Sequence, residues 1–180
     1  PRPFRRIRYQ EAMNRFGTDK PDLRYGFEIV RLDGIEETTD FALFQQAKAE
    51  SLLIAGINFD GQAESYTRKK LDALTTFAKG IGANGMLWVK KTAEGIQSSF
   101  NKFLTEETKQ FLEARFSLNE GDVAVILIGS EMKTLERLGT LRTTVANEQL
   151  TFDPNDFALC WVVDFPMFEY DEEEQRYVAK

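Results

Sequence analysis

The feature that most constrains the fold is an uninterrupted apolar run at residues 123–128, bounded by Gly121 and Gly129. A strand with one solvated face alternates apolar and polar residues, whereas a short run that is apolar throughout is typical of a buried strand. The flanking glycines are typical of chain turns. We therefore predict that this run is the central strand of a sheet.

Strand and helix patterns alternate around this run from about residue 27 to residue 150. Strand candidates have consecutive or alternating apolar residues, and helix candidates have apolar residues on one stripe. Thr67 and Thr105 are candidate N-caps, because a threonine hydroxyl can accept a hydrogen bond from a free first-turn N–H. The pattern predicts strands at 51–59 and 86–89 and helices at 67–79, 105–116 and 131–147. We expect an α/β fold, specifically an α+β sandwich with a mixed or antiparallel sheet and helices mainly on one face.

The two flanks of this region have a different character. A crude strand and a helix-compatible stretch lead into a polar loop at 18–24, where Pro21 favours an extended chain and indicates a domain boundary. After residue 150, we expect an antiparallel hairpin. Its first strand would be residues 159–163, its tip the acidic residues 171–174, and its return strand would begin at Tyr177. The sequence stops at Lys180 within that strand, so we expect an excised internal piece of a longer protein.

Composition argues against several classes of function. The net charge is −6, which predicts weak electrostatic affinity for RNA, and histidine is absent. A metal site is not expected either, because the chain has no Cys/His cluster and the acidic residues 171–174 are better explained as a solvated tip. We predict no catalytic residue and no metal ligand in this segment.

The remaining composition favours a cytoplasmic protein. No apolar run is long enough to span a bilayer, and no hydrophobic signal segment follows the N-terminal arginines. The single cysteine, Cys160, lies between Leu159 and Trp161, which suggests a buried thiol. We interpret Trp88 and Trp161 as core residues because both lie within apolar runs.

Two groups of charged residues are candidate contact sites. Arg6 and Arg8 would share one face of a strand and could bind phosphate, but the favoured explanation is a solvent-facing strand edge protected by charge. A denser group in the polar loop could contact RNA or a neighbouring domain, or could form a hinge held by local charge pairs. Its members are Asp19, Lys20, Asp22 and Arg24.

Four stretches carry a resemblance to a known family. Residues 9–24 (YQEAMNRFGTDKPDLR) resemble the segment after class II motif 2 in bacterial aspartyl-tRNA synthetases, and 161–169 (WVVDFPMFE) resemble the return into the catalytic sheet. Residues 67–79 with 85–90 (TRKKLDALTTFAK and GMLWVK) look like the signature of the inserted GAD domain, and 100–104 (FNKFL) are similar to its next helix lead-in. The match covers nearly the whole chain in order.

The resemblance implies a three-part organisation. Residues 1–26 would be a catalytic-domain fragment and hinge, residues 27–150 the inserted domain, and residues 151–180 a truncated return, marked by Asp164 and Pro166, into the catalytic sheet. The parent would use ATP and magnesium to activate aspartate, charge tRNA and form a homodimer. Its arginine loop, paired histidines and motif 3 arginine would lie outside this chain.

The function implied is therefore that of a non-catalytic insertion that braces the catalytic domain and helps to position tRNA, with weak RNA binding of its own. The alternative is a binding domain of a tRNA-dependent amidotransferase subunit, which shares the GAD domain. Because an insertion must leave and rejoin one sheet, we expect residues 7–9 and 159–163 to lie close together.

Overall fold

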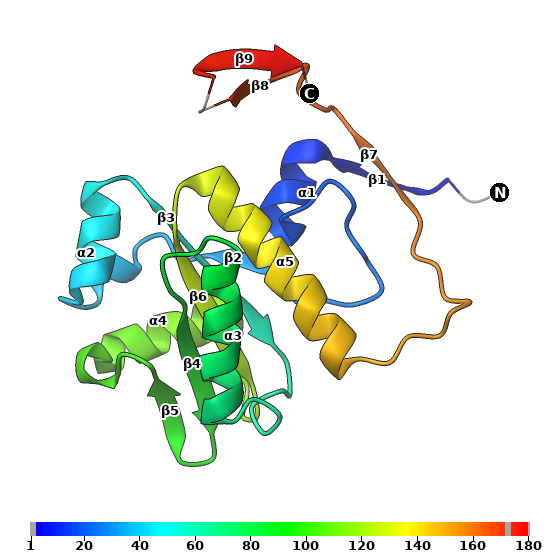
Figure 1. Ribbon diagram of the computed structural model, residues 1–180. Coiled ribbons are helices and arrows are strands. Elements are labelled where there is room, and N and C mark those ends of the chain that lie inside the picture. Colours follow the sequence, from blue (N-terminus) through cyan, green and yellow to red (C-terminus); the bar gives the residue numbers. More distant parts are fainter. Residues whose placement is uncertain (1–2, 172–173, 180) are drawn as a thin grey trace.

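The predicted central strand is the middle of a five-stranded sheet in a computed structural model that describes residues 3–171 and 174–179 (Figure 1). It is β6 (Val123–Gly129), and it pairs with β3 (Leu53–Phe59) and β4 (Leu87–Thr92). The outer strands are β2 (Ile29–Arg31) and β5 (Gly95–Ser98), in the order β2-β3-β6-β4-β5. All neighbours are antiparallel, which confirms the predicted class and sheet type.

Both faces of the central strands are buried. Along β6, Val123, Val125 and Leu127 belong to one core cluster, while Ala124 and Ile126 belong to another. Side chains alternate between the two faces of a strand, so a run with no polar position requires cover on both sides. The apolar run therefore organises two cores, one on each face of the sheet.

The helices cover the sheet from both sides. α3 (Arg68–Gly80) and α5 (Glu131–Gln149) pack on one face, and α2 (Ala42–Ala49) and α4 (Glu106–Phe116) pack on the other (Figure 1). The expectation that helices lie mainly on one face was therefore wrong. α2 was not predicted from the sequence. A central strand that is apolar on both faces needs helices on both sides of the sheet, and the expectation did not take this into account.

The predicted helix caps are confirmed. The Thr67 hydroxyl accepts from Lys70 N at 3.4 Å, and the Thr105 hydroxyl accepts from Thr108 N at 3.0 Å. Two short 3-10 helices, η1 (Ile35–Glu37) and η2 (Asn101–Phe103), complete the connections. None of the described helices is both long and apolar enough to cross a membrane.

The two flanks meet beside this sandwich, as expected. β1 (Arg5–Arg8) pairs in parallel with β7 (Cys160–Val163), so that Ile7 lies opposite Val162. α1 (Tyr9–Phe16) follows β1 directly. Segments that are about 150 residues apart in sequence are therefore neighbours in one small sheet (Figure 1).

The C-terminal hairpin differs from the expected one. It joins β8 (Phe168–Asp171) to β9 (Arg176–Ala179), and β7 takes no part in it. Glu172 and Glu173 of the expected acidic tip lie outside the described residues. Trp88 is buried as predicted, but Trp161 is 61% exposed and Cys160 only partly buried. β7 pairs with β1, but none of the described residues covers the face of β7 that carries Trp161. Apolar neighbours in the sequence were therefore not enough to bury this side chain.

The flank and the sandwich touch through two glycines. Gly17 ends α1 with φ +66°, and a Cβ on Gly139 of α5 would lie 2.6 Å from the Gly17 carbonyl oxygen. This distance is too short for a methyl group, and the neighbouring atoms belong to the backbone, which cannot move aside as a flexible side chain could. Gly139 weakens α5 by about 1 kcal/mol of helix propensity relative to alanine, and the close approach of α1 accounts for its presence.

We expect Gly139→Ala to lower the free energy of unfolding by about 1–3 kcal/mol, the usual range for overpacking, despite the better helix propensity of alanine. Urea denaturation followed by circular dichroism measures the change. The control is Gly80→Ala at the end of α3, where an added Cβ meets nothing within 4 Å. It should be neutral or slightly stabilising. Equal stability of Gly139→Ala and the parent chain would contradict the close-contact interpretation.

Candidate interdomain contact site

The polar loop after α1 contains a local charge pair. Arg24 Nη2 lies 2.6 Å from Asp22 Oδ2, and the Arg24 guanidinium stacks 4.4 Å from the Phe152 ring centroid. The hydrogen bond from Arg24 lowers the pKa of the Asp22 carboxyl. Asp19 and Lys20 have no side-chain ion pair within the described residues. The structure therefore joins two of the four candidate loop residues, in the arrangement expected of a local hinge.

A buried arginine from the sandwich holds this loop from the other side. Arg142 of α5 is only 1% exposed, and its Nη2 donates to the carbonyl oxygens of Asp22 (2.7 Å), Tyr25 (3.0 Å) and Gly26 (2.9 Å). Its guanidinium also lies 4.1 Å from the Tyr25 ring centroid and 4.9 Å from that of Phe16. The loop is therefore tied to α5 by its backbone, independently of its own side chains.

The charge of Arg142 is compensated mainly by these carbonyl dipoles. Burial lowers the pKa of its guanidinium, but an arginine starts from so high a pKa that it stays protonated. A buried charge costs free energy unless its donors are satisfied. Sequence analysis missed Arg142, although one signal was available: it interrupts the inward stripe of α5 directly after Leu141.

A second link connects α1 to the residue just before β2. Arg15 Nε donates to Glu28 Oε2 at 2.9 Å, and the same guanidinium reaches Glu11 within α1. The hydrogen bond from Arg15 lowers the pKa of Glu28. These groups are partly exposed, so water screens the attraction and each pair contributes little to stability.

At the junction of β1 and β7, two predicted residues meet. Arg8 Nε lies 3.3 Å from Asp164 Oδ2, and both side chains are mostly exposed. Arg6 is exposed beside them and has no ion pair within the described range. Asp164 adopts φ +59°, and Phe165 beside it lies 5.1 Å from the Tyr9 ring. The arrangement matches a solvated strand edge with one charge pair better than a phosphate site.

Beyond Asp164, the return segment borders an open pocket of about 500 Å³. Its lining combines α1, the start of α5, the return segment and β8, including Tyr9, Met132, Asp164 and Pro166. Large side chains around this segment are exposed to solvent, notably Phe157 (73%), Trp161 (61%) and Met167 (78%). Exposed apolar side chains in such number are typical of a surface that another protein segment covers.

Comparison with known families now distinguishes the sandwich from its flanks. Residues 43–138, more than half of the chain, match the family model described as the GAD domain. The chain belongs to the GAD domain family. The matched span runs from α2 into α5 and includes most of the sheet, but it contains neither the polar loop nor the β1–β7 junction.

The GAD match is accompanied by similarity that extends into both flanks. An aspartate–tRNA(Asp/Asn) ligase of Caldanaerobacter subterraneus is 46% identical over 99% of this chain and 30% of its own length. An aspartate–tRNA ligase of Lysinibacillus sphaericus is 39% identical over 99% of this chain, and one of Bacteroides fragilis is 44% identical over 98% of it. In both cases the match covers 30% of the relative's own length. The chain thus spans about 30% of the length of these curated relatives.

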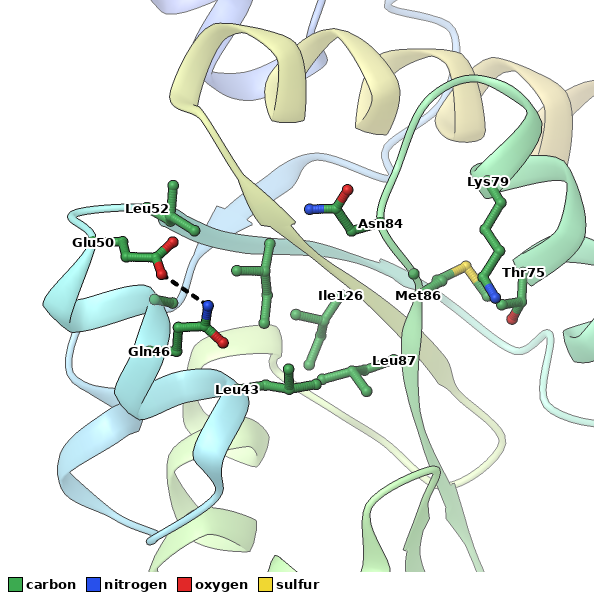
Figure 2. A pocket seen from close by; sticks show the side chains of 13 residues that line it. Leu43, Gln46, Glu50, Leu52, Thr75, Lys79, Asn84, Met86, Leu87 and Ile126 are labelled. Atoms are coloured by element: carbon green, nitrogen blue, oxygen red, sulfur yellow. Dashed lines mark hydrogen bonds between the residues drawn. The ribbon is translucent and has the colours of Figure 1, made fainter.

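The GAD domain has a pocket of its own, of about 350 Å³. Figure 2 shows the apolar side chains of Leu43, Leu87 and Ile126 grouped together, with Gln46 of α2 bonded to Glu50 nearby. Lys79 reaches in from the last turn of α3. An apolar floor with a polar rim is a common form of binding pocket, but here one cation and one carboxylate leave no net charge to select a ligand.

We expect Arg142→Met to lower the free energy of unfolding by about 2–4 kcal/mol, because three carbonyl oxygens lose a charged donor in a buried place. The loop should also open, so that trypsin cleaves faster after Arg24. Denaturation curves and timed proteolysis measure both effects. The matched control is Arg115→Met on α4, an exposed arginine with one carbonyl bond and one ring contact, which should change stability by about 0.5 kcal/mol or less. If both variants behaved alike, Arg142 would not be a clamp.

Proposed function

We propose that this chain is the inserted module, with its flanking strands, of an aspartate–tRNA ligase, and that it braces the catalytic domain and helps to position tRNA. In this proposal residues 27–150 form the inserted domain, and residues 1–26 and 151–180 belong to the catalytic domain. The whole enzyme activates aspartate with ATP and magnesium and works as a cytoplasmic homodimer. The observation that carries the proposal is similarity to such ligases over 98–99% of the chain, flanks included.

The geometry supports an insertion. β1 and β7 are adjacent and parallel, so a single sheet can contain both ends of the inserted module. The Arg142 bonds and the Gly17–Gly139 contact couple the module to the strand–helix unit that precedes it. A module attached by flexible linkers alone would need neither contact. Bracing is therefore the role that these contacts favour, and the loop residues Asp19, Lys20, Asp22 and Arg24 would lie at the hinge.

An amidotransferase subunit with a GAD domain is the alternative, and the flanks argue against it. The similarity to ligases includes the polar loop and the return segment around Asp164 and Pro166, outside the matched span 43–138. A shared GAD domain alone would not extend the similarity to these ends. Within the described residues, no group of three or more acidic, histidine or cysteine side chains could hold a metal ion. In this proposal, ATP and magnesium are bound by the parts of the enzyme outside this chain.

The isolated chain should show no aspartate-dependent ATP–pyrophosphate exchange, because that reaction needs cationic groups and magnesium at the phosphates. The assay is run with and without aspartate, with the Caldanaerobacter ligase as positive control. tRNA should bind weakly, and less as salt rises from low to moderate concentration. Exchange above background, or sub-micromolar tRNA binding that survives moderate salt, would overturn the division of roles.

Bracing can be tested by replacing the corresponding segment of the Caldanaerobacter ligase with this chain, which aligns over 99% of its length. The chimera should retain exchange and tRNA charging. Adding Arg142→Met should lower kcat for charging at least about tenfold, because small displacements of positioning elements have large effects on rate. Arg115→Met in the same chimera is the control. An active chimera that tolerates Arg142→Met would show that the brace is dispensable.

A further inference from the structure

A group of cations lies far from the hinge, at the start of α3. The first turn of this helix contains Arg68, Lys69 and Lys70 and no acidic residue. The N-terminus of a helix carries partial positive charge, so cations there are unfavourable and anions favourable. The chain as a whole has a net charge of −6. Three consecutive cations at this position therefore repel one another and the helix N-terminus, and a bound anion would reduce this repulsion.

An open pocket of about 350 Å³ lies beside this turn. Arg68 contributes to one side, while Ser99, Lys102 and Phe103 contribute from the chain around η2, and Phe41 from the start of α2. Two of the stretches singled out in the sequence, 67–79 and 100–104, therefore meet in space around one cavity. Phe100 is part of the core, but Arg68, Lys102 and Phe103 are exposed to solvent.

The pocket has an aromatic wall. Phe41 stacks on Phe103 at a centroid distance of 4.9 Å with 30° between the ring planes, and on Phe100 at 5.3 Å with 8°. Phe100 is buried, whereas Phe103 keeps 36% of its surface exposed. The stack therefore holds Phe103 in place while leaving part of it accessible. A fixed, accessible aromatic ring next to cations is the combination that unpaired nucleotides bind, by stacking the base and pairing the phosphate.

The polar groups around the wall are available for a ligand. Among the described residues, the one ion pair of Arg68 is with Asp72, at 3.3 Å between two exposed side chains. Such a pair is weak, so a phosphate can displace it. Lys102 has no ion pair within the described residues. The Ser99 hydroxyl accepts from Trp88 N at 3.1 Å and keeps its own proton to donate. Arg68 also lies 5.7 Å from the Trp88 ring, so this tryptophan reports on the pocket.

We propose that this pocket binds one unpaired nucleotide of an RNA, with the base stacked against Phe103 and the phosphate held between Arg68 and Lys102. The proposal rests on the proposed function, in which the partner is a tRNA, and it assigns the contact to the β4–β5 end of the GAD domain rather than to the hinge. A base-paired strand does not fit this chemistry, because its bases are already stacked and cannot reach the ring.

The test uses the full chain carrying Trp161→Phe, which leaves Trp88 as the single tryptophan. Three probes are titrated at low salt: a fluorescently labelled single-stranded RNA octanucleotide, the duplex of the same sequence, and inorganic tripolyphosphate. Anisotropy measures RNA binding, and Trp88 emission shows whether a ligand reaches the pocket. We expect the single strand to bind at least about fivefold more tightly than the duplex and to change Trp88 emission. Equal binding of single strand and duplex, or no binding, would overturn the proposal.

Variants locate the contact. Phe103→Ala, Arg68→Gln and Lys102→Gln should each weaken single-strand binding about five- to tenfold, with unchanged unfolding curves. The matched controls are Phe77→Ala, a ring on α3 of similar exposure (37%), and Lys79→Gln at the opposite end of that helix. Controls that weaken binding as much as the pocket variants would overturn the assignment. If the chimera is active but the chain does not bind the octanucleotide, the nucleotide-binding pocket is refuted and the proposed function stands. If the chain binds the octanucleotide but the chimera is inactive, the proposed function is refuted and the pocket stands.

Discussion

The buried guanidinium of Arg142 is the interaction on which the relation between the sandwich and its flanks depends. A charge that is 1% exposed must have its donors satisfied, and no carboxylate forms an ion pair with it among the described residues. The polar loop satisfies it instead, by turning the carbonyls of Asp22, Tyr25 and Gly26 toward α5. That loop path places the end of α1 against α5, and the contact is possible only because Gly17 and Gly139 have no side chains.

The same coupling connects the flanking strands to the sandwich. β1 enters α1 directly, α1 is held on α5, and β7 then pairs with β1 in register. Surface charge pairs such as Arg8–Asp164 add little, because water screens them. The aromatic side chains of the return segment are exposed, and in the proposed function they would pack against the rest of the catalytic domain.

The two candidate contact regions of the molecule differ in chemistry and lie at different ends. The hinge and the β1–β7 junction are at one end, with one ion pair in each, while the β4–β5 hairpin is at the other (Figure 1). Near that second end, cations crowd the first turn of α3 beside a stacked, partly exposed phenylalanine. A module held rigidly at one end can present the other end at a defined place, because helices and a doubly covered sheet transmit position without a flexible joint.

The sequence by itself determined several local elements, although it did not predict α2. The apolar run of β6 and the threonine caps of α3 and α4 follow from neighbouring residues, through the burial pattern and the free first-turn donors. It also indicated the family through motifs 67–79 and 161–169. Only the tertiary structure decided which sheet face each helix covers, that Arg142 clamps the loop, that Trp161 is exposed, and that residues 67–79 and 100–104 line one pocket. These outcomes depend on contacts between residues that are far apart in the chain. Hydrophobic periodicity indicates which side chains are buried, but it does not indicate which elements they pack against.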